Sequence, residues 1–284
     1  MTLRATTLVG ALVVLLLVAV PAARADLDHA KRPPTAHPAD VAAAWFDMLY
    51  QVVKAERTGP PPASRVYGLA GVALYESLVS GSPGHRSLVG QLNELTSLPA
   101  PKRGPKHHWP SVAGSALARV IRGLYPTASP ASLAAVDGLE AAFDAESRAR
   151  VARPVHERSV ALGRAVAEGV LAWAATDGLT THASCPYAPS GMSGSWEPTP
   201  PAFAPNPAQP CWGQLRPMVL ASGAECGPPG PPAFSTDPGS DFHASALDVY
   251  GAGAASRTSR RSSPTTGRTG PGRPARRPAT GSRS

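Results

Sequence analysis

Apolar residues recur every three or four positions along most of residues 40–177, which is the spacing of one face of a helix. The pattern predicts helices over residues 40–57, from after a break at the prolines 60–62 to about 80, over 87–95, over 109–124, from 130 onward, and from about 154 to 176. Ser129 before Pro130 is a typical helix start, because serine caps free backbone amides and proline suits the first turn. No alternating strand pattern occurs there, so we predict an all-α region over residues 26–180.

The following segment has a different composition. Residues 183–238 hold 14 prolines in 56 positions, too many for a helix or a central strand. The segment also carries large apolar side chains that a disordered linker does not need, namely Trp196, Phe203, Trp212, Leu215, Val219 and Phe234. We therefore predict a long ordered segment, residues 181–250, that wraps around and packs on the helices.

Residues 1–25 have the pattern of a signal peptide. Arg4 precedes an apolar run over residues 8–20, and Ala23-Arg24-Ala25 is a site of the kind that signal peptidase cleaves. A run of about 13 apolar residues is short for a permanent anchor, because a bilayer core is about 30 Å thick. An uncleaved anchor is the alternative. We expect secretion or export, cleavage after Ala25, and no stable membrane anchor afterwards.

The excess positive charge lies in one segment. The chain has 27 basic and 19 acidic residues, a net charge of +8. Residues 256–284 hold eight arginines and no acid, so the rest of the chain is neutral. They contain no large apolar side chain, which predicts a disordered tail over residues 251–284. Because the tail lacks aromatic rings to stack on bases, we expect no nucleic-acid partner.

Three cysteines, Cys185, Cys211 and Cys226, suggest one disulfide and one free thiol. Sequence alone leaves all three pairings open. None of them has the Cys/His spacing of a zinc site.

Several side chains that could perform chemistry have simpler structural interpretations. Adjacent His107 and His108 would point in different directions and chelate poorly, so we expect them at the surface. Helical spacing places Asp137, Glu140 and Asp144 on a solvated face. Glu157 near a helix start favours the helix dipole.

No complete catalytic motif is present in the chain. Ser159, Ser190 and Ser240 lack the strand–turn–helix setting of a hydrolase nucleophile. No glycine-rich phosphate loop followed by lysine occurs either. The sequence therefore predicts no catalytic, cofactor-binding or metal-binding residue in this chain.

Six stretches carry a family resemblance: PPPASRVYGLAGVALYESLV (60–79), HHWPSVAGSAL (107–117), ERSVALGRAVAEGVLAWAATDG (157–178), SWEPTPPAF (195–203), PCWGQLRPMVL (210–220) and PPAFSTDPGSDF (231–242). They resemble the N-terminal portion of exported vanadium-dependent haloperoxidases, in the type 2 phosphatidic acid phosphatase superfamily. The likeness covers about residues 38–250. It implies the N-terminal part of a helical bundle.

In that family the chemistry lies in the C-terminal half. A Lys…Arg-Pro stretch, a Pro-Ser-Gly-His stretch and a Ser-Arg…His stretch bind vanadate or phosphate, because a trianion requires several cations and donors. In this chain Met192 follows Pro189-Ser190-Gly191 where histidine is required, and Arg216-Pro217 has no lysine at the required distance before it. The resemblance thus implies vanadate for a full-length member and no catalytic residue here.

The sequence of the tail suggests why the catalytic motifs are missing. The family pattern continues with a segment like YWADGPGATGTPPGHWI, and a reading frame shifted by one base over residues 265–282 could encode it. We expect that a frameshift, genuine or a sequencing error, replaced the catalytic half. The helices would then expose apolar faces and lack their packing partner, the missing C-terminal half of the same fold.

Two functional hypotheses follow. The first is a truncated haloperoxidase-like protein, inactive as written, whose parent would oxidise halide with peroxide or hydrolyse a phosphoester. The second is an exported helical interaction protein whose basic arm binds anionic polymers or surfaces, with salt-sensitive affinity. The sequence leaves open which activity the parent has, its substrate and its oligomeric state.

Overall fold

The computed structural model describes residues 30, 32–102, 104–183, 185–192 and 195–262. The chain divides into two compact units, each described by itself: Met1–Ala188 with Pro198–Gly227, and Pro189–Glu197 with Pro228–Ser284. The predicted signal peptide and residues 263–284 lie outside the described part of the chain, so their predictions stay untested.

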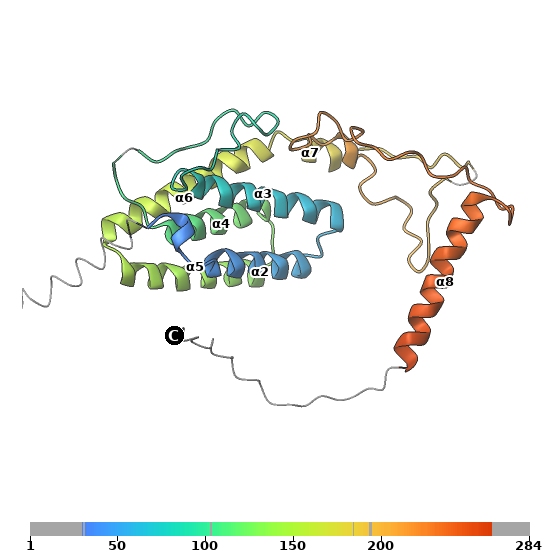
Figure 1. Cartoon of the computed structure of the whole chain (residues 1–284), viewed down its shortest axis with the longest axis horizontal. Helices are drawn as coiled ribbons and strands as arrows, with labels where there is room; N and C mark the ends of the chain where they lie inside the picture. The colour runs from blue at the N-terminus through green and yellow to red at the C-terminus, as the bar shows by residue number, and fades with distance from the viewer. Residues whose placement is uncertain (1–29, 31, 103, 184, 193–194, 263–284) are drawn as a thin grey trace, which may run out of the picture. The chain divides into compact units, whose positions relative to one another are not determined.

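The first unit is built from α-helices, as Figure 1 shows. A short 3₁₀ turn, η1 (Pro34–Ala36), precedes α2 (Asp40–Ala55), α3 (Pro60–Val79), α4 (Trp109–Leu124), α5 (Pro130–Arg150), α6 (Arg153–Ala174) and α7 (Leu179–Ala183). No strand occurs among the residues that the structure describes, and the all-α prediction is confirmed.

Prolines and a serine start these helices. The prolines at 60–62 form the first turn of α3 rather than a break before it, because proline has no amide hydrogen to leave unbonded there. At α5, the Ser129 hydroxyl oxygen accepts a hydrogen bond from the Ser132 amide, as the sequence predicts. Glu56, the residue after α2, accepts hydrogen bonds from the hydroxyls of Ser129 (2.7 Å) and Ser132 (2.6 Å). This carboxylate therefore joins the end of α2 to the start of α5.

The helix predicted over residues 87–95 is wrong, because these residues form a series of turns. Buried Glu76 of α3 accepts hydrogen bonds from the Ser87 hydroxyl (2.8 Å) and the Leu88 amide (2.6 Å), which hold the start of this segment against α3. Gly90 and Glu94 have positive φ values of 76° and 60°, which a right-handed helix does not allow.

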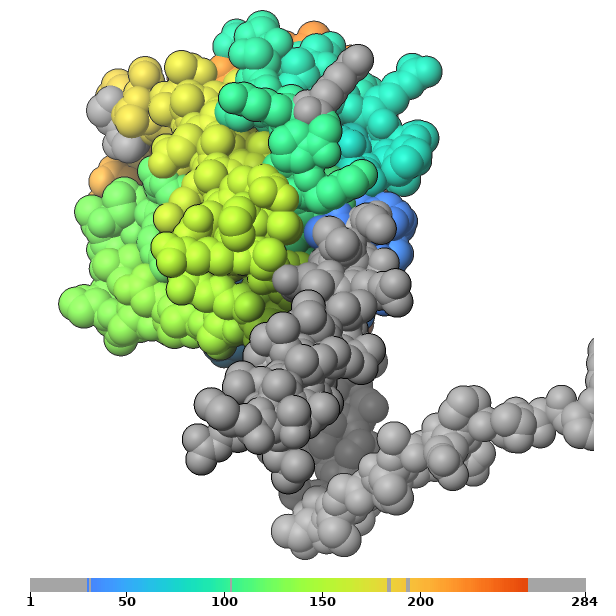
Figure 2. Space-filling view, turned by 90° about the vertical axis from the view of Figure 1, so that its left-hand side faces the viewer, coloured from blue at the N-terminus to red at the C-terminus, as the bar shows by residue number. Residues whose placement is uncertain are grey.

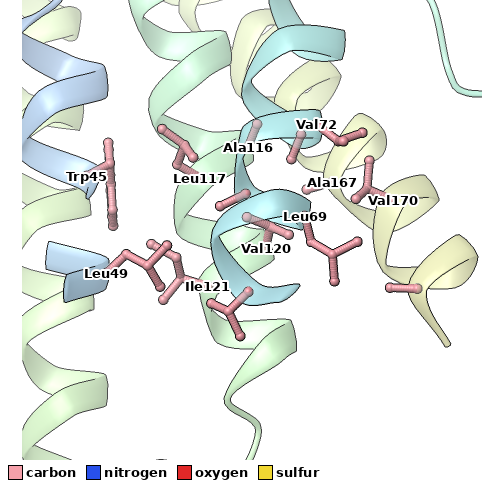
Figure 3. Packing of buried hydrophobic residues seen from close by; sticks show 14 of the residues in the cluster. Trp45, Leu49, Leu69, Val72, Ala116, Leu117, Val120, Ile121, Ala167 and Val170 are labelled. Atoms are coloured by element: carbon pink, nitrogen blue, oxygen red, sulfur yellow. The ribbon is translucent and has the colours of Figure 1, made fainter. Parts of the chain in front are cut away.

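The centre of the first unit is α4, which contacts α2, α3, α5 and α6. A helix that is apolar on most sides is stable only when it is surrounded. Figure 3 shows side chains from four helices pointing into the same interior, among them Trp45, Leu49, Leu69, Leu117, Ile121 and Val170. Each of these six is at most 2% exposed. Burial of the α4 surface therefore holds the bundle together.

The closest helix pair is α4 with α6. A Cβ added at Gly163 of α6 would lie 2.2 Å from both the Ser115 hydroxyl oxygen and the Val112 carbonyl oxygen of α4. The second of these atoms is backbone and has little freedom to move. Glycine at 163 is thus required for this approach.

The expectation that the helices expose apolar faces is wrong for the described part of α2–α6. The only large hydrophobic residue there that is strongly exposed is Tyr50, at 51%. The helices cover one another around α4, which the apolar spacing of each helix taken singly does not reveal. Other exposed large hydrophobics lie later in the chain: Tyr187, Met192, Trp196, Phe203, Val219, Leu220, Phe234, Leu247, Val249 and Tyr250.

Part of the proline-rich segment belongs to the first unit. Leu215 is buried, and the Asn93 side-chain amide donates to the carbonyls of Pro217 (2.9 Å) and Leu220 (2.7 Å). A disulfide joins Cys185 to Cys211, and Cys226 is a free, exposed thiol. The structure thus selects one of the three pairings that the sequence leaves open.

The second unit contains α8 (Asp241–Ser262). The Ser240 hydroxyl oxygen accepts from the His243 amide (3.2 Å), and the rings of Phe234 and Phe242 lie 5.1 Å apart. The prediction of disorder from residue 251 is therefore wrong for residues 251–262. Once a helix has started, each further residue that is fixed adds one backbone hydrogen bond, so α8 can continue from Asp241 into this stretch.

Replacing Gly163 by alanine tests the approach of α4 to α6. We expect Gly163→Ala to lower the free energy of unfolding by about 1–3 kcal/mol, since the new methyl overlaps backbone. The matched control is Gly138→Ala on α5, where a Cβ meets nothing within 4 Å. It should raise stability by about 0.5–1 kcal/mol. Urea titration measures both, and an unchanged Gly163→Ala midpoint would contradict the packing described.

Glu56→Gln tests the junction of α2 and α5 through pH. Hydrogen bonds from Ser132 and then Ser129 lower the pKa of Glu56 below its ordinary value of 4.5. A lowered carboxyl pKa contributes stability above the unfolded value, and this contribution is lost as pH falls through the folded value. Glu56→Gln should therefore be less stable than the parent at neutral pH, and the difference in stability should shrink as the pH falls below 4.5 and through the lowered folded pKa. A difference that stays constant during acid titration would refute this role.

Candidate functional site

A chain of buried polar side chains lies where α4, α5 and α6 meet. The His108 Nδ1 and the Ser111 Oγ are 2.8 Å apart, and the Ser111 Oγ is 3.1 Å from the His156 Nδ1. The His156 Nε2 lies 2.6 Å from the Asp144 Oδ1. His108 precedes α4, Ser111 lies in its first turn, His156 is on α6 and Asp144 on α5. Three helices therefore supply one continuous hydrogen-bonded path.

The environment of this path sets the direction of its hydrogen bonds. His108, Ser111 and His156 are buried, whereas Asp144 is 33% exposed and also pairs with Arg148 at 2.8 Å. Since the carboxylate accepts, the His156 Nε2 donates to it. With a neutral imidazole, the His156 Nδ1 then accepts from the Ser111 hydroxyl, whose oxygen accepts from the His108 Nδ1. Every atom on the path has a partner.

Serine, histidine and aspartate in this order are the chemical components of a nucleophilic triad. The cavity beside Ser111 and His156, however, measures only about 20 Å³, which is room for about one water molecule. No acyl substrate can approach the hydroxyl there. The arrangement is therefore suited to fixing the three helices rather than to attacking a substrate. In Figure 2 the surface of α6 (yellow-green) is continuous with that of α5 (green).

The surface placement expected for His107 and His108 is wrong, because both are buried. The His108 amide donates to the Ser159 Oγ (2.9 Å), and Arg158 donates to the carbonyl of Lys106 (2.5 Å). The segment before α4 is thus held against α6. Burial, followed by the charge of Arg158, lowers the pKa of His107 below its ordinary value, so its neutral form is favoured.

The acids of α5 join helices rather than face solvent alone. Arg122 of α4 pairs with Asp137 (2.5 Å) and Glu140 (2.6 Å), and Arg164 of α6 pairs with Glu140 (3.1 Å). Asp137 is 64% exposed as predicted, but Glu140 is only 23% exposed. The predicted solvated face is therefore wrong for Glu140, because the arginines of its neighbours cover it.

The remaining sequence candidates have local roles. Exposed Glu157 pairs with Arg153 (2.6 Å), and this hydrogen bond lowers its pKa. Ser159 is fully buried and donates to the carbonyl of Val155 (2.6 Å). Ser190 donates to the Ser195 hydroxyl in the second unit (2.6 Å). None of them forms part of a catalytic arrangement within the described residues.

A second polar group, absent from the sequence predictions, lines a cavity of about 410 Å³ in the first unit. Arg65 of α3 pairs with Asp177 at 2.5 Å, and both side chains are almost 90% buried. Arg216 lies on the same cavity with Trp173 and Trp212. The pair spans 112 positions, so no local pattern could reveal it. The stretches that carry the family resemblance did contain these residues.

Neither a metal-binding cluster nor a membrane-spanning helix is found among the described residues. Among those described, no group of three or more His, Cys, Asp and Glu side chains is placed to hold a metal ion. No helix in that part of the chain is long and apolar enough to cross a membrane.

Comparison with solved structures identifies a protein of similar fold. No family model matches the chain, and no curated protein matches it. The solved structure of a protein described as the first bacterial vanadium-dependent iodoperoxidase matches with a TM-score of 0.68 and 27% sequence identity. The match covers 79% of this chain and 52% of that one, so this chain spans about half the length of the relative. The fold is haloperoxidase-like. The resemblance inferred from the six stretches is therefore confirmed at the level of the fold.

Ser111→Ala tests whether the buried path stabilises the helices. The substitution leaves two buried imidazole nitrogens without their hydroxyl partner, so we expect a loss of about 1–3 kcal/mol in unfolding free energy. Ser64→Ala on α3 is the control, because its exposed hydroxyl only donates to the carbonyl of Pro61. It should change stability by less than about 0.5 kcal/mol. Equal thermal midpoints for the two variants would show that the path does not stabilise the bundle.

Proposed function

We propose that this chain is the N-terminal helical part of an exported vanadium-dependent haloperoxidase-like protein, and that these 284 residues alone are catalytically inactive. The observation that carries the proposal is the structural match, which spans 79% of this chain but 52% of the iodoperoxidase. Export is part of the proposal because of the pattern in residues 1–25.

The described residues do not fit vanadate. A trianionic oxyanion requires several converging cations and an apical histidine. The arginines of the first unit that lie near one another are already paired, Arg65 with Asp177 and Arg216 with Glu94. Asp177 beside Arg65 would also repel a trianion. No catalytic step is therefore assigned to this chain.

What the chain contributes is a preformed helical framework. The core around α4 is closed without further protein, as the burial of Trp45 and Ile121 indicates. In the proposal, the other half of the fold supplies the oxyanion site and packs on this framework. Residues 251–284 are, in the same proposal, an out-of-frame translation where that half should begin. The parent enzyme oxidises halide with peroxide or hydrolyses a phosphoester.

Vanadate titration of the purified chain tests the proposed inactivity. We expect no saturable change in the ⁵¹V NMR signal at micromolar protein and vanadate, and no oxidation of iodide or bromide with peroxide. A vanadium-dependent iodoperoxidase assayed in parallel is the positive control. Micromolar saturable binding or halide oxidation by this chain would overturn the proposal. The protein expressed from an extended gene, read on in the shifted frame, should bind vanadate, because it contains the missing cationic residues.

A further inference from the structure

The cavity beside Arg65 has the size and composition of a small-molecule site. Its volume of about 410 Å³ falls in the usual range for ligand pockets, about 300–1,000 Å³. Leu69, Leu215 and Met218 supply apolar walls, and the indoles of Trp173 and Trp212 supply aromatic ones. All of these residues belong to the first unit. An apolar chamber with a few converging charges is typical of sites that bind one class of organic molecule.

Arg65 lines this cavity and retains hydrogen-bonding capacity beyond its contacts with protein. Its Nε donates to the Asp177 Oδ2 (2.5 Å) and its Nη2 to the carbonyl of Ala174 (3.0 Å). Its Nη1 has no acceptor among the described residues. Asp177 is itself occupied, since its Oδ1 accepts from the Leu179 amide (3.1 Å). The guanidinium is thus held in place by protein while one amino group can still donate to a ligand.

Arg216 is fixed differently. Its Nη1 contacts Glu94 (2.5 Å) and the Thr176 hydroxyl (2.9 Å), and its Nη2 donates to the carbonyl of Trp173 (2.6 Å). Its guanidinium also lies 5.2 Å from the centre of the Trp173 ring. Arg216 therefore contributes charge and holds the indole, and its buried Nε has no hydrogen-bond partner among the described residues.

The charge on the cavity wall favours a monoanion. Two arginines and one aspartate line it, which leaves one net positive charge. Glu94 does not line the cavity and its side chain is 69% exposed, but its carboxylate pairs with Arg216 at 2.5 Å and so offsets part of that arginine's charge. A trianion carries more negative charge than these side chains can neutralise, and a cation is repelled by their net positive charge.

The walls are set before any ligand binds. The Trp173 Nε1 donates to the carbonyl of Asn93 (2.9 Å), and Trp212 follows Cys211, which the disulfide ties to Cys185. The Arg216 amide donates to the carbonyl of Asp177 (2.9 Å), so the segment that carries Trp212 is joined to the end of α6. A site that is already ordered loses less entropy on binding.

We propose that this cavity binds a small aromatic monocarboxylate, whose carboxylate lies at Arg65 and whose ring lies against Trp173 and Trp212. The site goes beyond the proposed function, because it lies wholly in this chain and needs neither vanadate nor the other half of the fold. Binding involves no covalent step.

Calorimetry on the full chain with three ligands of one shape tests the proposal. Phenylacetate, phenylacetamide and phenethylamine share a ring and differ in charge. We expect saturable binding of phenylacetate with a Kd below about 5 mM, a value suited to a ligand of this size. The Kd of the amide should be at least about ten-fold higher, because it lacks the charge-assisted hydrogen bond, and the amine should be weaker still. Equal affinity for acid and amide, or no binding of the acid, overturns the proposal.

Variants locate the site. Trp212→Ala should raise the Kd of phenylacetate at least about five-fold through lost ring contact. Arg65→Lys keeps a positive charge beside Asp177 but loses the planar guanidinium. It should raise the Kd of phenylacetate by a similar factor. Tyr50→Ala removes an exposed aromatic ring of α2 that does not line the cavity and should leave the Kd unchanged. Wild-type affinity in both cavity variants overturns the assignment.

A variant that fails to fold leaves the proposal testable. Nuclear Overhauser contacts between the phenylacetate ring and the Trp212 indole, measured on the unaltered chain, are expected. Contacts to other indoles only would place the ligand elsewhere and overturn the proposal. Since the test uses neither vanadate nor halide, its result is independent of the titration that tests the proposed function.

Discussion

The approach of α4 to α6 at Gly163 is the constraint on which the rest of the first unit depends. With the two backbones in contact there, Ser111 and His156 come within hydrogen-bonding distance, and α5 is drawn in through Asp144. The apolar sides of α4 that remain are covered by α2 and α3. Packing in protein interiors is as dense as in organic crystals, so a single added methyl at this point would displace several helices.

Local features of the sequence were sufficient to predict α2–α6 but not the turns over residues 87–95, α8 or the polar contacts between the helices. The start of α5 follows from Ser129 and Pro130, and the bounds predicted for α4 agree with the structure, because capping and spacing are local properties. The burial of His107 and His108 depends on Arg158 and Ser159, which lie about fifty positions away in sequence. The disulfide joins cysteines 26 positions apart, and the Arg65–Asp177 pair at the cavity joins residues 112 positions apart.

Fold and chemistry are separate conclusions for this chain. A haloperoxidase-like arrangement of helices is shown, whereas catalytic ability depends on particular residues grafted on such a fold. The charged side chains in the described part of the first unit mainly form ion pairs between or within helices. The balance of charge around Arg65, Asp177 and Arg216 suits one negative charge on an organic molecule and not a trianion. A framework of this kind can thus carry a ligand site of its own while the oxyanion chemistry belongs elsewhere in the fold.

The most direct test of the account is to sequence the genomic DNA from codon 240 to several hundred bases past the codon for Ser284. The account predicts that the frame shifted by one base spells a segment like TPPGHW across residues 265–282 and continues into a Lys…Arg-Pro stretch, a Pro-Ser-Gly-His stretch and a Ser-Arg…His stretch. A missing or extra base in the corrected sequence would join the two halves directly. If no frame encodes these stretches downstream, the chain is not one half of an oxyanion-dependent enzyme, and the central claim is contradicted.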